Sequence, residues 1–175
     1  KGAYTFDLSG NQFLDYGMAL RSVNIGYAEE EINQAAIEQI INGNNLTRPS
    51  IIELEAAELL IELIDSVEMV KFTKNGSTAV TAAVKLSRAY TNRDLVAVCS
   101  DHPFFSYDDW FIGSTQITKG IPENVIKQTK KFKYNDIKSL ENLIDEYPDE
   151  IACVILEPST FQHPTLLLNS KKENL

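Results

Sequence analysis

Residues 72–90 read FTKNGSTAVTAAVKLSRAY, and this stretch decides how the chain folds. A polar turn at 75–78 leads into a predicted helix from about Thr78 to Tyr90, in which small and apolar residues recur at helical spacing. The next apolar run, LVAVCS at 95–100, is typical of a strand buried on both faces. A helix that leads into a buried strand indicates an α/β protein. We expect the apolar residues of the helix to be part of the core: Ala79, Ala83, Leu86 and Tyr90.

The same stretch lies in a segment without acidic residues, although the whole chain has a formal net charge of −9. From Lys71 to Arg93 there are five basic residues and no Asp or Glu; we call residues 71–93 the acid-free segment. The start of a helix presents unpaired backbone N–H groups and a partial positive charge. An empty helix start after Asn75, Gly76 and Ser77 therefore predicts a bound phosphate. The alternative is that Ser77 merely caps a structural helix.

Secondary-structure elements alternate along the rest of the chain. Strand–turn–strand spacing near the N-terminus predicts a β-hairpin, and later apolar patterns predict alternating helices and strands. This order indicates an α/β fold with a mostly parallel sheet, helices on both faces and an N-terminal β-hairpin. The expected elements are a hairpin at 4–13, helices at 29–41, 50–64 and 136–146, and strands at 68–72, 130–134 and 151–158.

Composition limits the class of protein. The acidic balance, with a pI near 4.7, argues against nucleic-acid binding, and no apolar run is long enough to cross a membrane. Cys99 and Cys153 both lie in apolar runs, which favours reduced thiols and a cytoplasmic protein. The chain opens on Lys-Gly and closes on a polar segment, so we expect it to be part of a longer protein. Neither His102 nor His163 is expected to be catalytic, and no metal-ligand spacing is present.

Several motifs together resemble one known family. The segment VEMVKFTKNGSTAVTAAVKLSRAYTNRD is similar to the phosphate-binding segment of class III, pyridoxal-phosphate-dependent aminotransferases, and the glutamate-1-semialdehyde aminomutase branch looks most similar. KGAYTFDLSGNQFLDYG, HPFFSYDDWF and CVILEP resemble further family motifs in the same order. The resemblance implies a fold-type-I transferase, with an N-terminal hairpin and helix segment at 1–48 and part of the large domain at 49–175.

The resemblance also implies roles for individual residues. Asn75, Gly76 and Ser77 stand where the family grips the cofactor phosphate, and Asn75 replaces a Ser. Phe104 stands where a Tyr stacks on the pyridine ring, and Phe105 replaces the following His; simple core packing is the alternative for both. Glu157 matches the Glu of the family's Glu-Pro strand end, and a solvated carboxylate is its alternative. Arg21 and Arg48 lie where relatives build the substrate pocket, although surface or structural roles explain them equally well.

The implied function is amino-group transfer to or within a carbonyl-containing small molecule, with pyridoxal 5′-phosphate as cofactor. The expected partners are a small-molecule amino donor and acceptor and a second copy of the chain in a homodimer. No lysine here matches the family's Schiff-base position, so we assign no catalytic residue and expect this chain alone to be inactive. The alternative is a non-catalytic α/β module that binds a phosphate ligand or a partner chain.

Overall fold

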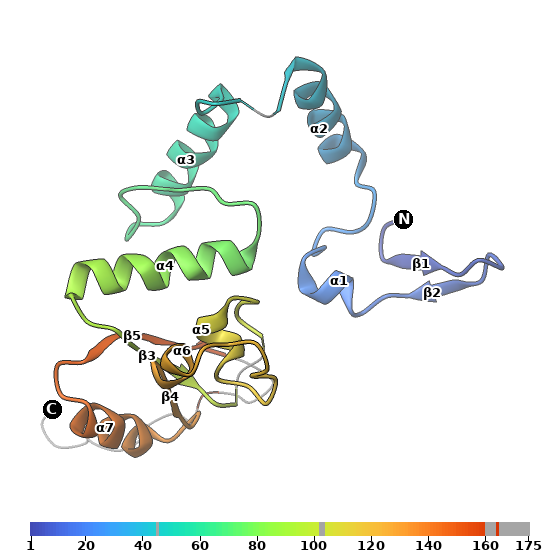
Figure 1. Cartoon of the computed structure of the whole chain (residues 1–175). Helices are drawn as coiled ribbons and strands as arrows, with labels where there is room; N and C mark the ends of the chain where they lie inside the picture. Colours follow the sequence, from blue (N-terminus) through green and yellow to red (C-terminus); the bar gives the residue numbers. More distant parts are fainter. Residues whose placement is uncertain (45, 102–103, 160–163, 165–175) are drawn as a thin grey trace, which may run out of the picture. The chain divides into compact units, whose positions relative to one another are not determined.

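A computed structural model describes residues 1–44, 46–101, 104–159 and 164 (Figure 1). The chain divides into two compact units, Lys1–Lys71 (unit 1) and Phe72–Leu175 (unit 2). The sequence-based boundary between residues 48 and 49 comes from the resemblance to the family and not from the compactness of the structure. It stays a prediction.

Unit 1 begins with the expected hairpin. Strands β1 (Tyr4–Phe6) and β2 (Gln12–Leu14) pair in antiparallel orientation. The Asp7 carboxylate closes the turn between them by accepting hydrogen bonds from the backbone N–H groups of Ser9 and Asn11, both within 2.9 Å. A short turn, α1 (Met18–Arg21), follows with left-handed backbone angles.

Two helices complete unit 1, as the sequence predicts. Helix α2 (Glu30–Asn42) and helix α3 (Ile51–Leu63) have no buried side chain. Helix α3 begins with a capping box in which Ser50 and Glu53 bond each other's backbone N–H groups. Both helices therefore present their apolar residues at the surface of the described chain.

The strand expected at 68–72 is a wrong prediction. The described strands of the chain pair only as β1 with β2 and as β3, β4 and β5, and residues 68–72 belong to neither group. An extended apolar segment becomes a strand only when a neighbouring strand accepts its hydrogen bonds, and sequence periodicity cannot reveal that neighbour.

Unit 2 is the α/β part of the chain. Its three strands are all parallel in the order β4-β3-β5, which confirms the mostly parallel sheet. The elements are α4 (Gly76–Thr91), β3 (Leu95–Cys99), α5 (Asp109–Ile112), α6 (Glu123–Lys127), β4 (Thr129–Phe132), α7 (Ile137–Glu146) and β5 (Ile151–Ile155). Helices α4 and α7 match the predicted helices to within a few residues, whereas the short helices α5 and α6 were not predicted from the sequence.

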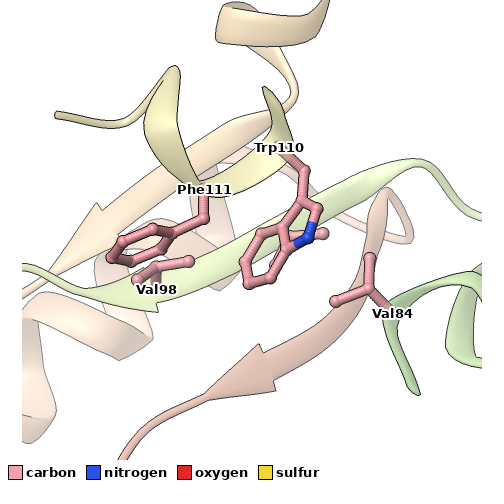
Figure 2. Close-up of a cluster of buried hydrophobic side chains, with 5 residues drawn as sticks. Val84, Val98, Trp110 and Phe111 are labelled. Carbon is pink, nitrogen blue, oxygen red and sulfur yellow. The ribbon is translucent and has the colours of Figure 1, made fainter. Parts of the chain in front are cut away.

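Strand β3 is the centre of the core, and all five of its residues are buried. Val96 and Val98 pack with Val84 of α4 and with the rings of Trp110 and Phe111 from α5, as Figure 2 shows for the labelled side chains. On the opposite face, the alternate residues of β3 pack with β4 and α7; these are Ala97, Cys99, Phe132 and Leu143. Helices therefore cover both faces of the sheet, as the sequence predicts.

The inward face of α4 differs from the predicted one. Val80 and Val84 contact the core, whereas Leu86 and Tyr90 are 71% and 90% exposed. Val80 and Val84 are four residues apart and share one face of the helix, while Leu86 lies on the other side. Small and apolar residues lie on several faces of this helix, so their spacing alone did not identify the face that contacts the core.

Candidate functional site

The start of α4 is capped by Asn75. Its Oδ1 atom accepts hydrogen bonds from the backbone N–H of Thr78 at 2.9 Å and from the Thr78 hydroxyl at 3.0 Å. The alternative that Ser77 caps this helix is therefore wrong. Asn is as good an N-cap as Ser, and here it stands two residues earlier, so the helix begins at Gly76.

The space beside the capped start is open. A Cβ atom added at Gly76 would meet no atom within 4 Å, so the backbone there is accessible to a ligand. Within the described part of the chain, the backbone N–H groups of Gly76 and Ser77 donate no hydrogen bond, as expected for the first turn of a helix. The first turn also contains no acidic residue. The α4 start therefore has the free donors and the favourable dipole that an anion requires.

An aromatic loop, residues 104–108 between β3 and α5, lies against the same turn. The backbone N–H of Tyr107 donates to the Ser77 Oγ at 3.3 Å, and the Ser106 hydroxyl lies 3.5 Å from the Ser77 carbonyl oxygen. Two segments about 30 residues apart in sequence thus meet at Ser77.

Phe104 and Phe105 occupy this loop in different environments. Both rings make edge-to-face contacts with Phe111, with centroids 5.7 and 5.6 Å apart. Phe105 packs against the core, whereas Phe104 is 62% exposed. The packing alternative therefore describes Phe105 well, and it leaves most of the Phe104 ring available to a partner.

Glu157 follows β5 by two residues and is half-buried. Because β3 and β5 are parallel neighbours, their carboxyl ends lie at the same edge of the sheet, which is where ligands bind in open α/β sheets. This placement agrees with the expected position of Glu157 at a strand end, and its contact with a cofactor stays a prediction.

The two arginines assigned to a substrate belong to unit 1. Arg21 is the last residue of α1, and Arg48 is exposed in the connection between α2 and α3. Their roles stay predictions.

The described residues add three chemical facts. Both cysteines are free thiols, and burial raises the pKa of Cys99 and of Cys153. Among the described residues no group of three or more His, Cys, Asp or Glu side chains could hold a metal ion; His102 and His163 lie outside them. No described helix is long and apolar enough to cross a membrane.

A group of polar side chains between α4 and the aromatic loop was not predicted from the sequence. Thr81 lies at its centre and contacts Ser106, Asp108 and Trp110 through hydrogen bonds. Ser106 is fully buried. The segment HPFFSYDDWF carries three of these residues, but nothing in the sequence indicates that they meet Thr81.

Known proteins resemble this chain over most of its length. The glutamate-1-semialdehyde 2,1-aminomutase of Francisella philomiragia is 32% identical over 167 residues, which cover 90% of this chain and 38% of the relative. The chain therefore spans about two fifths of the length of the curated relatives it matches.

Solved structures show the same fold. An omega-transaminase from Sphaerobacter thermophilus superposes with a TM-score of 0.84 at 32% identity, over 91% of this chain and 40% of that one. A transaminase with PLP bound gives a TM-score of 0.85 at 26% identity, over 92% of this chain and 40% of that one. The family described as "Aminotransferase class-III" matches residues 1–162. The resemblance found in the sequence is thus confirmed, and the chain belongs to the class III aminotransferase family.

Proposed function

We propose that the chain is part of a pyridoxal-phosphate-dependent aminotransferase or aminomutase, which moves an amino group to or within a carbonyl-containing small molecule. The observation that carries the proposal is the open, acid-free start of α4, with an aromatic loop bonded to it, in a chain of this family. The amino donor and acceptor are small molecules, and the choice between aminotransferase and aminomutase stays open.

The residues at the α4 start fit the phosphate of the cofactor. The backbone N–H groups of Gly76 and Ser77 and the Ser77 hydroxyl supply donors, and the Asn75 side chain supplies an Nδ2 donor while its Oδ1 caps the helix. The open space at Gly76 allows an anion to approach the backbone. The helix dipole adds about 0.3–1 kcal/mol to anion binding at an exposed site.

Ring contacts complete the proposed site. Phe104 offers an exposed aromatic face for the pyridine ring, although without the hydroxyl of the family's Tyr, and Phe105 supports the loop by packing on the core. Glu157 lies at the carboxyl edge of the sheet, where it would approach the cofactor. When bound, pyridoxal phosphate supplies an electron-withdrawing ring that stabilises negative charge at the substrate carbon.

Substrate and assembly are proposed from the family alone. Arg21 and Arg48 are candidates for a substrate carboxylate, since a guanidinium binds a carboxylate through two parallel hydrogen bonds. A homodimer and a cytoplasmic location are proposed in the same way.

The proposal is tested by binding of pyridoxal phosphate and inorganic phosphate, measured by ³¹P NMR titration of the 175-residue chain. Ser77→Ala removes a proposed phosphate donor, whereas the control Ser87→Ala removes a hydroxyl later in the same helix, which bonds the Ala83 carbonyl and the Cys153 thiol. Weaker binding of both ligands to Ser77→Ala alone supports the site. Equal binding to both variants and the wild type contradicts it.

Borohydride reduction followed by mass analysis tests the assignment of no Schiff-base lysine. Scattered low-level labelling of surface lysines is expected. A stoichiometric adduct on one lysine, such as Lys74, would show that the chain contains its own Schiff-base residue and that the assignment is wrong.

A further inference from the structure

The hydroxyl of Thr81 lies at the centre of the polar group between α4 and the aromatic loop. Trp110 Nε1 donates to the Thr81 Oγ1 at 2.9 Å, and the Ser106 Oγ lies 3.2 Å from it. The Thr81 hydroxyl in turn donates to the Asp108 carboxylate. Three residues from the loop and the start of α5 therefore converge on one atom of the helix.

The Thr81 hydroxyl has one donor and two acceptor positions, and this arrangement places a partner within reach of each. The Thr81 proton goes to Asp108, and one lone pair accepts from Trp110. The Ser106 hydroxyl lies within hydrogen-bond distance of both the Thr81 Oγ1 and the Ser77 carbonyl oxygen, and it has one proton to share between them. Ser106 has no exposed surface, and its Oγ also accepts from the Asp108 backbone N–H at 3.1 Å. A buried hydroxyl in such a network is costly to leave unpaired, so loss of Thr81 Oγ1 disturbs all three partners.

The bonds at Ser77 and Thr81 act on the same loop. Ser77 and Thr81 are four residues apart, so their side chains lie on one face of α4. Tyr107 bonds to Ser77, and its neighbours Ser106 and Asp108 bond to Thr81. The loop that carries Phe104 is thereby joined to α4 at two successive turns, the first of which is the proposed phosphate site.

We propose that Thr81 is a positioning residue: its hydroxyl holds the aromatic loop, which carries Phe104, against the start of α4 formed by Gly76 and Ser77. This inference rests on the proposed function, because that function assigns the phosphate to the start of α4 and the pyridine ring to Phe104. We assign Thr81 no contact with the cofactor; it acts through Asp108, Ser106 and Trp110.

The experiment compares Thr81→Val, which removes the hydroxyl at nearly constant shape, with Thr81→Ser, which keeps it. Thr91→Val is the matched control, because the Thr91 hydroxyl donates to the Ser87 carbonyl at the far end of α4. Trp110 is the only tryptophan of the chain, so its fluorescence reports directly on its bond to Thr81. Amide hydrogen exchange at Tyr107 and Asp108 reports on the attachment of the loop.

Thr81→Val is expected to shift the Trp110 emission and to speed exchange at the two amides by about three- to tenfold, the effect of one net hydrogen bond. Thr81→Val should also weaken the binding of pyridoxal phosphate by a similar factor and leave the binding of inorganic phosphate unchanged. Only pyridoxal phosphate has a ring that would contact Phe104. Thr81→Ser and Thr91→Val should behave as the wild type.

The proposal is overturned if Thr81→Val leaves both the Trp110 emission and the amide exchange unchanged. It is also overturned if Thr81→Val weakens the binding of pyridoxal phosphate and of inorganic phosphate equally. If Thr81→Val does not fold, Asp108→Ala decides instead: it removes the acceptor of the Thr81 proton, and unchanged exchange at Tyr107 overturns the proposal. If the wild-type chain binds neither ligand, the proposed function is wrong, and so is the proposed effect of Thr81 on cofactor binding. Emission and exchange would then still decide whether Thr81 holds the loop.

Discussion

Replacing Asn75 by Asp distinguishes capping of helix α4 from anion binding at the start of that helix. Asn75 caps the helix through its Oδ1 atom, and an Asp carboxylate caps equally well. A negative charge at a helix N-terminus is stabilised by about 0.3–1 kcal/mol, and the first turn contains no other acid to repel it. The free energy of unfolding should therefore stay constant or rise slightly in Asn75→Asp.

Anion binding should respond in the opposite direction. Two unit charges about 4 Å apart interact by about 1 kcal/mol in bulk water, and the repulsion between a carboxylate and a phosphate with nearly two charges is about 2 kcal/mol. Since each 1.4 kcal/mol is a factor of ten, the dissociation constant for phosphate or pyridoxal phosphate should rise about 30-fold. Partial burial would increase the loss.

Urea denaturation and ³¹P NMR titration measure the two effects on the same sample. Asn75→Ser is the control for charge, because it keeps an uncharged cap and, like Asn75→Asp, lacks the Nδ2 donor. The difference in anion binding between the Asp and Ser variants therefore measures the effect of the negative charge. Salt near 1 M reduces the Debye length to about 3 Å and should remove most of the difference in anion binding between the Asp and Ser variants. Unchanged anion binding in Asn75→Asp at low salt would refute the assignment of this helix start as the phosphate site.

Three other predictions concern stability and titration. Val84→Ala should lower the free energy of unfolding by about 2 kcal/mol, because Val84 is 2% exposed in the core, whereas Leu86→Ala, 71% exposed, should change it by less than about 0.5 kcal/mol in a urea titration. Burial raises the pKa of Cys99, so the thiol ionises at lower pH in the unfolded chain than in the folded one. The free energy of unfolding should therefore fall as pH rises above the pKa of the unfolded thiol. Alkylation of Cys99 in the native state should be slow, because the thiolate is the reactive form. The Tyr27 hydroxyl, 2.5 Å from the Asp15 carboxylate, lowers the pKa of Asp15, so this contribution to stability is lost as pH falls; Tyr27→Phe should raise that pKa in an NMR titration.

The order of helices and strands was predictable because it depends on local patterns. The buried run at 95–100 and the apolar spacing at 136–146 identified β3 and α7 closely. The strand at 68–72 was wrong because strand formation depends on a partner elsewhere in the chain. The inward face of α4 was wrong because apolar residues lie on several faces, and only contact with β3 and α5 selects Val84.

The candidate site divides in the same way. The absence of acids and the Asn-Gly-Ser turn are local properties, so the sequence could indicate Asn75, Gly76 and Ser77. The choice of Asn75 over Ser77 as the cap required the backbone, since both residue types cap helices well.

The contribution of Thr81 lies beyond sequence analysis for a physical reason. A threonine in the second turn of a helix is unremarkable, and 24 residues separate it from the buried serine that it bonds. Its role depends on the three hydrogen-bonding partners around one half-buried hydroxyl, which α4, the aromatic loop and α5 bring together. If this network fixes the loop as we infer, the hydroxyl of Ser77 is bonded to a loop that is already in place. Its proton then remains available for a phosphate while its oxygen accepts the Tyr107 N–H, so that one side chain joins the anion site to the aromatic loop.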